Sequence, residues 1–307
     1  MNVPAAPPRS GQKVRSRHDR DRPAPRKDLI MSKKIGFVGL GTMGLPMAVN
    51  LNKAGFEVIG YDAFEGSREK AKAAGITIAE TLKEVAERAD DAVVSMVRDY
   101  AQNVDVILGE DGLLSAGPQG LTVIVMSTLD PDTMNELGQR VEEAGDVRLI
   151  AAAVSGGATG AQAGTLSIMT SGHEDRVRAA RPYFDAVGSH VFYYGSEPGN
   201  SQAAKLVNNL ILGITMNAVA EGLKFGAQYD LPEEELLNLF RVSTGDSWVA
   251  RNWDSVSQWT ADTALAVLLK DLKAAHLKGL EHNVAMPFNA LSSTQLFDSM
   301  GQKPQAE

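Results

Sequence analysis

Cysteine is absent from this chain of 307 residues. Its absence excludes disulfides, cysteine nucleophiles and zinc sites with thiolate ligands. Histidine is scarce as well: the five histidines are scattered, and no two of them form a metal-binding pair such as H-E-x-x-H. The sequence therefore predicts a protein without a resident metal ion.

Long apolar runs and two common catalytic motifs are also missing. No apolar run approaches the ~18 residues that a membrane helix needs, so we expect no membrane partner. The lack of a Walker sequence and of a G-x-S-x-G elbow argues against a P-loop nucleotidase and a serine hydrolase. The N-terminus has no apolar secretory segment, and we expect a cytoplasmic protein.

Charge is distributed unevenly along the chain. Residues 1–30 hold eight of the 30 basic and three of the 38 acidic residues, so they carry +5 and the remainder carries −13. An acidic body argues against nucleic-acid binding. Residues 1–30 also contain five prolines and little apolar periodicity, which predicts a disordered tail over 1–32. Two explanations stay open for it: an extension ahead of a natural start at Met31, or a basic arm that contacts acidic partners.

The rest of the chain divides into two regions of different periodicity. Short apolar runs typical of buried strands occur at 34–39, 56–62, 76–78, 92–97, 122–126 and 148–153. Segments with helical periodicity lie between them, for example at 43–54. This alternation predicts an α/β domain over 33–195, with a doubly wound parallel sheet covered by helices on both faces.

Only helical periodicity is visible beyond that point. Helices are predicted at 201–228, 232–241, 247–259, 263–282 and 287–300, which gives an all-helical C-terminal domain over 196–307. The first of them is apolar on more than one face, since Leu206 and Leu210 do not share a narrow stripe with Val207 and Ile211. A helix that is apolar nearly all round must be covered on all sides. We therefore expect a homodimer or homotetramer assembled through this domain.

A glycine-rich turn follows the first predicted strand and opens the first helix. The motif G-x-G-x-x-G at 39–44 has the context of a dinucleotide-binding fingerprint, in which the helix N-terminus receives the pyrophosphate. Asp62 ends the second strand 18 residues after Gly44, where an acidic side chain binds the ribose hydroxyls of NAD and repels the 2′-phosphate of NADP. The pattern predicts NAD rather than NADP, and Arg68, further into the next helix, is the residue that could reverse this preference. The predicted cofactor contacts here are Gly39, Gly41, Thr42, Met43, Gly44 and Asp62.

A second group of polar residues lies beyond the sheet. Ser155 precedes two glycines, Gly156 and Gly157, whose backbone N–H groups suit a carboxylate, although a plain surface turn has the same composition. Lys205 and Asn209 are four residues apart, so they share one helix face. A solvated lysine is the simpler explanation of Lys205 taken alone.

Three motifs in this order resemble the β-hydroxyacid dehydrogenase family, which includes 3-hydroxyisobutyrate dehydrogenases and tartronate semialdehyde reductases. They are GFVGLGTMGLPMAVNL at 36–51, VSGGATGAQAGTLSIM at 154–169 and GNSQAAKLVNN at 199–209, with a weaker match in LLKDL at 268–272. The resemblance covers residues 33 to about 300. It implies a Rossmann-type NAD-binding domain followed by a helical domain, and hydride transfer between a nicotinamide cofactor and a small 3-hydroxy acid or its aldehyde or ketone.

The resemblance also implies roles for individual residues. Lys205 matches the catalytic lysine and Asn209 the asparagine that orients the substrate. The implied substrate-binding residues are Ser155, Gly156, Gly157 and Asp271, and the further cofactor contacts are Val97, Arg98, Gln102, Thr128 and Lys270. A cationic nicotinamide and Lys270 would both disfavour the charge on Lys205, so that this lysine could exchange a proton near neutral pH.

Some positions depart from the family pattern and leave the substrate open. Ala151–Ala153 replaces Asp-Ala-Pro, Arg98 replaces a proline and Thr263 replaces a phenylalanine. A phosphogluconate-type enzyme is disfavoured because it has histidine where Asn208 stands. The alternatives are a dinucleotide-binding sensor or scaffold without catalysis, and an imine or semialdehyde reductase of the same fold.

Overall fold

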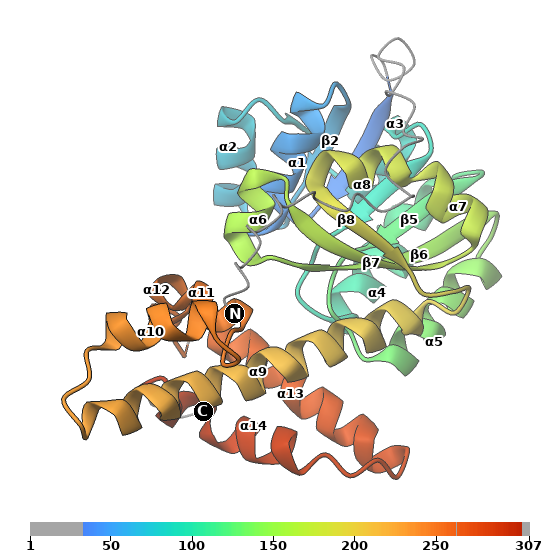
Figure 1. Cartoon of the computed structure of the whole chain (residues 1–307). Helices are drawn as coiled ribbons and strands as arrows, with labels where there is room; N and C mark the ends of the chain where they lie inside the picture. The colour runs from blue at the N-terminus through green and yellow to red at the C-terminus, as the bar shows by residue number, and fades with distance from the viewer. Residues whose placement is uncertain (1–32, 262, 303–307) are drawn as a thin grey trace, which may run out of the picture.

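A computed structural model describes residues 33–261 and 263–302, so the predicted tail at 1–32 lies outside the described residues. An N-terminal α/β region carries a sheet with helices on both faces, and a region of helices follows it (Figure 1). Helix α9 (Gly199–Ala227) starts beside the sheet and continues without a break through the helical region.

The sheet has the strand order β3-β2-β1-β4-β5-β6-β7-β8. Its strands are β1 (Lys34–Val38), β2 (Glu57–Tyr61), β3 (Thr77–Ile78), β4 (Ala92–Ser95), β5 (Leu121–Val125), β6 (Val147–Ser155), β7 (Leu166–Gly172) and β8 (Gly188–Tyr193). The central strands β4 and β5 are buried at every position, as the apolar runs predicted. The order reverses direction beside β1, which confirms the doubly wound α/β fold.

Two features of the sheet differ from the prediction. Strands β7 and β8 were not expected, and β7 runs antiparallel to β6, so the sheet is not wholly parallel. The chain reverses through Gly156 and Gly164, whose φ angles are +130° and +65°. Strand β7 is hard to recognise because it contains Thr170 and Ser171, which are buried and bind main-chain carbonyls of neighbouring segments.

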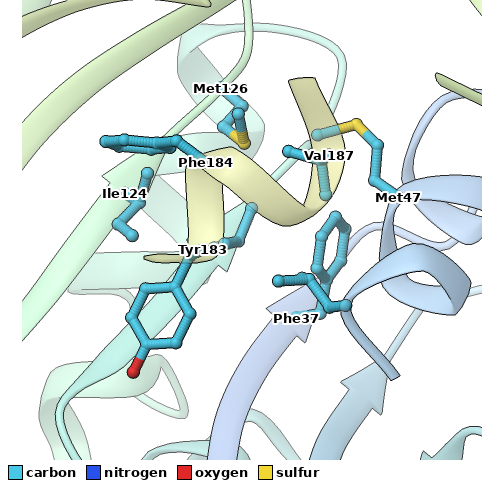
Figure 2. A pocket seen from close by; sticks show the side chains of 9 residues that line it. Phe37, Met47, Ile124, Met126, Tyr183, Phe184 and Val187 are labelled. Carbon is cyan, nitrogen blue, oxygen red and sulfur yellow. The ribbon is translucent and has the colours of Figure 1, made fainter. Parts of the chain in front are cut away.

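Helices cover both faces of the sheet. One apolar cluster joins the sheet to α1 (Gly44–Lys53), α2 (Glu65–Ala73), α6 (Gly157–Ala163), α7 (Glu174–Ala179) and α8 (Arg181–Val187). The other joins it to α3 (Leu82–Arg88), α4 (Tyr100–Leu108), the 3₁₀ turn η3 (Leu113–Ala116) and α5 (Pro131–Glu143). Figure 2 shows side chains of β1, β5, α1 and α8 converging around a small apolar cavity in the first cluster, among them Phe37, Met47 and Phe184. At its margin, the buried Tyr183 hydroxyl donates to Asp91 at 2.5 Å. This core fixes the strand ends that carry the glycine turn.

The C-terminal helices are α10 (Glu233–Val242), α11 (Trp248–Arg251), α12 (Trp253–Val256), α13 (Ala264–Glu281) and α14 (Pro287–Ser299). The helix predicted at 247–259 is two short helices that meet at Asn252. Helix α9 is long and apolar enough to cross a membrane by length and composition alone. In this structure, its apolar residues Met216, Val219 and Leu223 belong to a core shared with α10, α11, α13 and α14.

The first turns of α9 are fixed to the sheet region by hydrogen bonds. The Gly199 N–H donates to the Asn135 side chain of α5 at 2.6 Å, and the Ser201 N–H donates to the Ser171 hydroxyl of β7 at 3.1 Å. Gln202 is fully buried; it accepts from the Leu129 N–H and donates to the Ser127 carbonyl, both at 3.0 Å. These contacts set the position of Lys205, one turn further along α9.

Candidate active site

The glycine turn has the shape that a dinucleotide needs. A side chain at Gly39 would collide with the Met96 carbonyl, and one at Gly44 would collide with the Gly39 carbonyl, so both glycines are required by packing. Gly41 is different, because a Cβ there would meet nothing within 4 Å. Gly41 and Thr42 are exposed, and Met43 precedes the first residue of α1. The turn thus leaves open space at the helix N-terminus, where a pyrophosphate would bind.

Asp62 lies against this turn. Its carboxylate is 7% exposed and accepts from the Leu40 N–H at 2.7 Å and from the Phe64 N–H at 2.9 Å. Each carboxylate oxygen has a second lone pair, so both can still accept from ribose hydroxyls. Arg68, which the sequence places further into the next helix, turns back towards this strand end. Its Nη1 atom returns to the Asp62 carbonyl at 2.7 Å and to the Ala63 carbonyl at 3.1 Å.

The remaining predicted cofactor residues follow the neighbouring strands β4 and β5. The Val97 side chain lies beside Gly39, and the Val97 carbonyl accepts from the Ser127 hydroxyl at 2.7 Å. Arg98 and Gln102 are exposed, and the Gln102 side chain accepts from the Arg98 N–H at 3.0 Å. Because the carboxyl ends of parallel strands meet at one edge of the sheet, these residues share that edge with the glycine turn. The residues present therefore fit a dinucleotide.

Lys205 is the most unusual ionisable group in this region. Its side chain is 8% exposed and forms no hydrogen bond or ion pair with any described residue. Burial lowers the pKa of Lys205 from 10.5 to about 8; the Asp271 carboxylate opposes this shift and the Lys270 ammonium adds to it. The solvated lysine that we weighed against a functional one is thereby excluded. A buried amine with a pKa near neutrality can both accept and return a proton.

A chain of polar contacts joins α9 to α13 near Lys205, and it includes the Asp271 and Lys270 charges that act on this amine. Asn209 donates to the Asp271 carboxylate at 2.6 Å, and Asp271 is 1% exposed. The Lys270 ammonium lies 3.4 Å from the same carboxylate and donates to the Thr128 carbonyl at 3.0 Å. The predicted residues of α9, α13 and the segment after β5 therefore meet in one place.

The predicted carboxylate loop joins the same chain of contacts. The Asn208 side chain donates to the Ser155 hydroxyl at 3.3 Å and to the Asn209 side chain at 3.2 Å. Gly156 and Gly157 follow with φ angles of +130° and +60°, and a Cβ at Gly157 would meet nothing within 4 Å. The backbone N–H groups that begin α6 have no intrahelical acceptor, so the loop offers donors for a carboxylate.

Sequence reasoning missed two residues that organise this site. Asn208 was noted only as a departure from phosphogluconate-type enzymes, yet its side chain connects the substrate loop to α9. Gln202 was not singled out, although its buried amide holds the segment that contains Thr128. The available signal was an amide three residues before Lys205 on the same predicted helix. No group of three His, Asp or Glu side chains able to hold a metal ion occurs in the part of the chain that the structure describes.

Comparisons with known proteins agree with this geometry. Residues 34–195 match the family model described as the NAD binding domain of 6-phosphogluconate dehydrogenase. Residues 199–307 match the model described as NAD-binding of NADP-dependent 3-hydroxyisobutyrate dehydrogenase.

Individual proteins are similar over most of the chain. Mitochondrial 3-hydroxyisobutyrate dehydrogenase of Mus musculus is 37% identical over 230 residues, which cover 75% of this chain and 68% of that protein. The 2-(hydroxymethyl)glutarate dehydrogenase of Eubacterium barkeri is 33% identical over 271 residues, 87% of this chain and 89% of that protein. The crystal structure of a Salmonella typhimurium 3-hydroxyisobutyrate dehydrogenase superposes with a TM-score of 0.76 at 26% identity, over 87% of this chain and 93% of that one.

Proposed function

The chain belongs to the β-hydroxyacid dehydrogenase family and is an NAD(P)-dependent oxidoreductase that acts on hydroxyl groups; on that premise, we propose that it interconverts a small 3-hydroxy carboxylic acid and the matching aldehyde or ketone. The observation that carries the proposal is the buried Lys205, which pairs with no residue that the structure describes and lies near the Asn209–Asp271 pair. A protein that only bound a dinucleotide would have no need to keep an amine desolvated there.

We assign the proton step to Lys205. In oxidation, neutral Lys205 takes the proton of the substrate hydroxyl while the C–H electron pair leaves as hydride and the C=O bond forms. In reduction, protonated Lys205 returns the proton to the oxygen. The dinucleotide, when bound, supplies the hydride acceptor or donor. A pKa of about 8 lets Lys205 act in both directions near neutral pH.

The substrate is held from two sides in this proposal. The Ser155 hydroxyl and the backbone N–H groups at Gly156 and Gly157 bind its carboxylate. Asn209 places the hydroxyl-bearing carbon, and its bond to buried Asp271 fixes the amide. Asn208 links these two ends, so it sets the distance between the carboxylate and the reacting hydroxyl. We propose a short 3-hydroxy acid of the 3-hydroxyisobutyrate type as the substrate of this site.

We assign a preference for NAD to Asp62. Its carboxylate is held by two backbone N–H groups beside the glycine turn, where it accepts from the ribose hydroxyls and repels a 2′-phosphate. The other cofactor contacts in the proposal are those at Gly39–Gly44, Val97, Arg98, Gln102 and Thr128, with Lys270 at the nicotinamide end.

We also propose a homodimer or homotetramer built through the helical region. Large apolar side chains stay exposed there: Val207 and Ile211 on α9, Val267 on α13, and Phe288 and Leu291 on α14. Burying such residues against a second copy stabilises an assembly. Light scattering at micromolar concentration tests this, and a mass near that of one 32.8 kDa chain would refute it.

A cofactor-reduction screen tests the function. Purified protein is mixed with NAD⁺ or NADP⁺ and a panel of small 2-hydroxy, 3-hydroxy and 4-hydroxy acids, and absorbance of the reduced nicotinamide is followed. The proposal predicts turnover with at least one 3-hydroxy acid, faster with NAD⁺. Turnover confined to 2-hydroxy acids, or none with any member, would contradict it.

A further inference from the structure

The side chain of Arg68 is placed in a way that the NAD site does not explain. It starts from the first turn of α2 and folds back over the end of β2. Both of its hydrogen bonds go from Nη1 to main-chain carbonyls, those of Asp62 and Ala63. Within the described part of the chain, no carboxylate forms an ion pair with it, although other exposed arginines such as Arg178 and Arg181 pair with acids.

This position leaves most of the guanidinium free. A guanidinium has five N–H donors, and Nη1 supplies only two of them. Among the described residues, the donors on Nε and Nη2 have no partner, and this half-buried guanidinium forms no ion pair. They lie beside Asp62, whose carboxylate is placed to accept from the ribose hydroxyls. A phosphate on the 2′-hydroxyl would therefore meet two opposite charges at one turn.

We propose that Arg68 can bind the 2′-phosphate of NADP and that the Asp62 carboxylate prevents this binding in the native protein. This inference rests on the proposed NAD(P) binding at the glycine turn. In the native protein, the Asp62 carboxylate repels the phosphate, and Arg68 only closes the β2–α2 turn through the two carbonyls. The choice of NAD over NADP then depends on a single negative charge. Removal of that charge exposes a phosphate site that already exists.

Its two hydrogen bonds to main-chain carbonyls distinguish Arg68 from a nearby surface charge. An exposed arginine would lose side-chain entropy on binding a phosphate, whereas Arg68 is already held in place by the Asp62 and Ala63 carbonyls. A charge-assisted hydrogen bond between a fixed guanidinium and a phosphate changes affinity by about ten- to a hundredfold. The contribution of Arg68 is therefore large enough to measure.

The experiment measures binding at the adenosine end alone. The dissociation constants of NAD⁺, NADP⁺ and the fragment 2′,5′-ADP are determined by calorimetry for four full-length proteins: native, Asp62→Asn, Asp62→Asn with Arg68→Ala, and Asp62→Asn with Lys70→Ala. Asparagine keeps one oxygen that can accept from the Leu40 N–H, and it removes the charge together with the bond from the Phe64 N–H. Lys70 is the matched control, since it is an exposed cation on the same helix.

We expect Asp62→Asn to bind 2′,5′-ADP and NADP⁺ at least tenfold more tightly than the native protein. Adding Arg68→Ala should remove about tenfold or more of that affinity, and adding Lys70→Ala should change it less than twofold. The inference is overturned if Asp62→Asn gains no affinity for 2′,5′-ADP and NADP⁺, or if adding Arg68→Ala leaves that affinity unchanged. In either case, NAD⁺ binding by the native protein leaves the proposed function intact. Failure of the native protein to bind either dinucleotide overturns both. If Asp62→Asn does not fold by circular dichroism, Asp62→Ser replaces it in the same series.

Discussion

Replacing Lys205 with methionine is expected to stabilise the fold at neutral pH while it abolishes turnover. Burial holds the pKa of Lys205 at about 8 in the folded protein, against 10.5 for an ordinary lysine. Each unit of difference is worth about 1.36 kcal/mol, so the charged amine costs the folded state about 3 kcal/mol. Methionine has a similar shape and no charge to desolvate. The attraction of Asp271 is already contained in that pKa, and an imperfect fit of the methionine side chain reduces the gain, so we expect about 1–3 kcal/mol more free energy of unfolding.

The pH dependence of that gain identifies its origin. A lysine with a lowered folded pKa destabilises fully below pH 8, less as pH rises towards 10.5, and not at all above it. Urea denaturation at pH 7 and pH 10 should therefore show a gap between Lys205→Met and the native protein that shrinks at the higher pH. Lys273→Met, an exposed lysine of α13, is the control and should change stability by less than about 0.5 kcal/mol. A native protein more stable than Lys205→Met at pH 7, or a gap independent of pH, would refute the reasoning.

Two further predictions concern the proton site and the cofactor turn. In the oxidation direction kcat/KM should rise with pH with a midpoint near pH 8. Asp271→Asn should move that midpoint below 8 and Lys270→Met above it, since their charges act on the pKa of Lys205 with opposite sign. Shifts of the same sign, or none, would contradict the assignment. Gly41→Ala should weaken NAD⁺ binding at least tenfold with an unchanged Tm, because its methyl group would occupy open space. Gly44→Ala should lower the Tm itself, since its methyl group meets the main chain; equal Tm losses in both variants would exclude an open cradle at position 41.

Local patterns in the sequence were enough to predict the parts of the site that depend on neighbours in the chain. The turn at Gly39–Gly44, the acidic end of β2 and the shared face of Lys205 and Asn209 all follow from strand and helix geometry. The structure places Asp62 against the glycine turn, and it brings Asn209 of the α9 face against Asp271 of α13. The fold class followed in the same way from alternating strands and helices.

The features that were missed depend on contacts between distant segments. Strand β7 has buried Ser and Thr side chains, so its pattern does not alternate clearly, and its antiparallel direction is set by the glycine reversal ahead of it. The link from Asn208 to Ser155 joins positions 53 residues apart, and no periodicity reports such a pair. The sequence places Arg68 in the helix after β2, and only the structure shows that its long side chain returns to the preceding turn.

The most direct test of the account is the turnover of Lys205→Ala on the substrate identified by the screen, measured together with its NAD⁺ dissociation constant. Loss of a general acid or base costs about 10²–10⁴-fold in rate. Lys205 lies on α9, away from the glycine turn at the start of α1, so cofactor affinity should stay within about threefold of the native value. The account predicts a kcat reduced at least a hundredfold with NAD⁺ binding retained. A variant that keeps more than a tenth of the native kcat would show that Lys205 does not carry the proton.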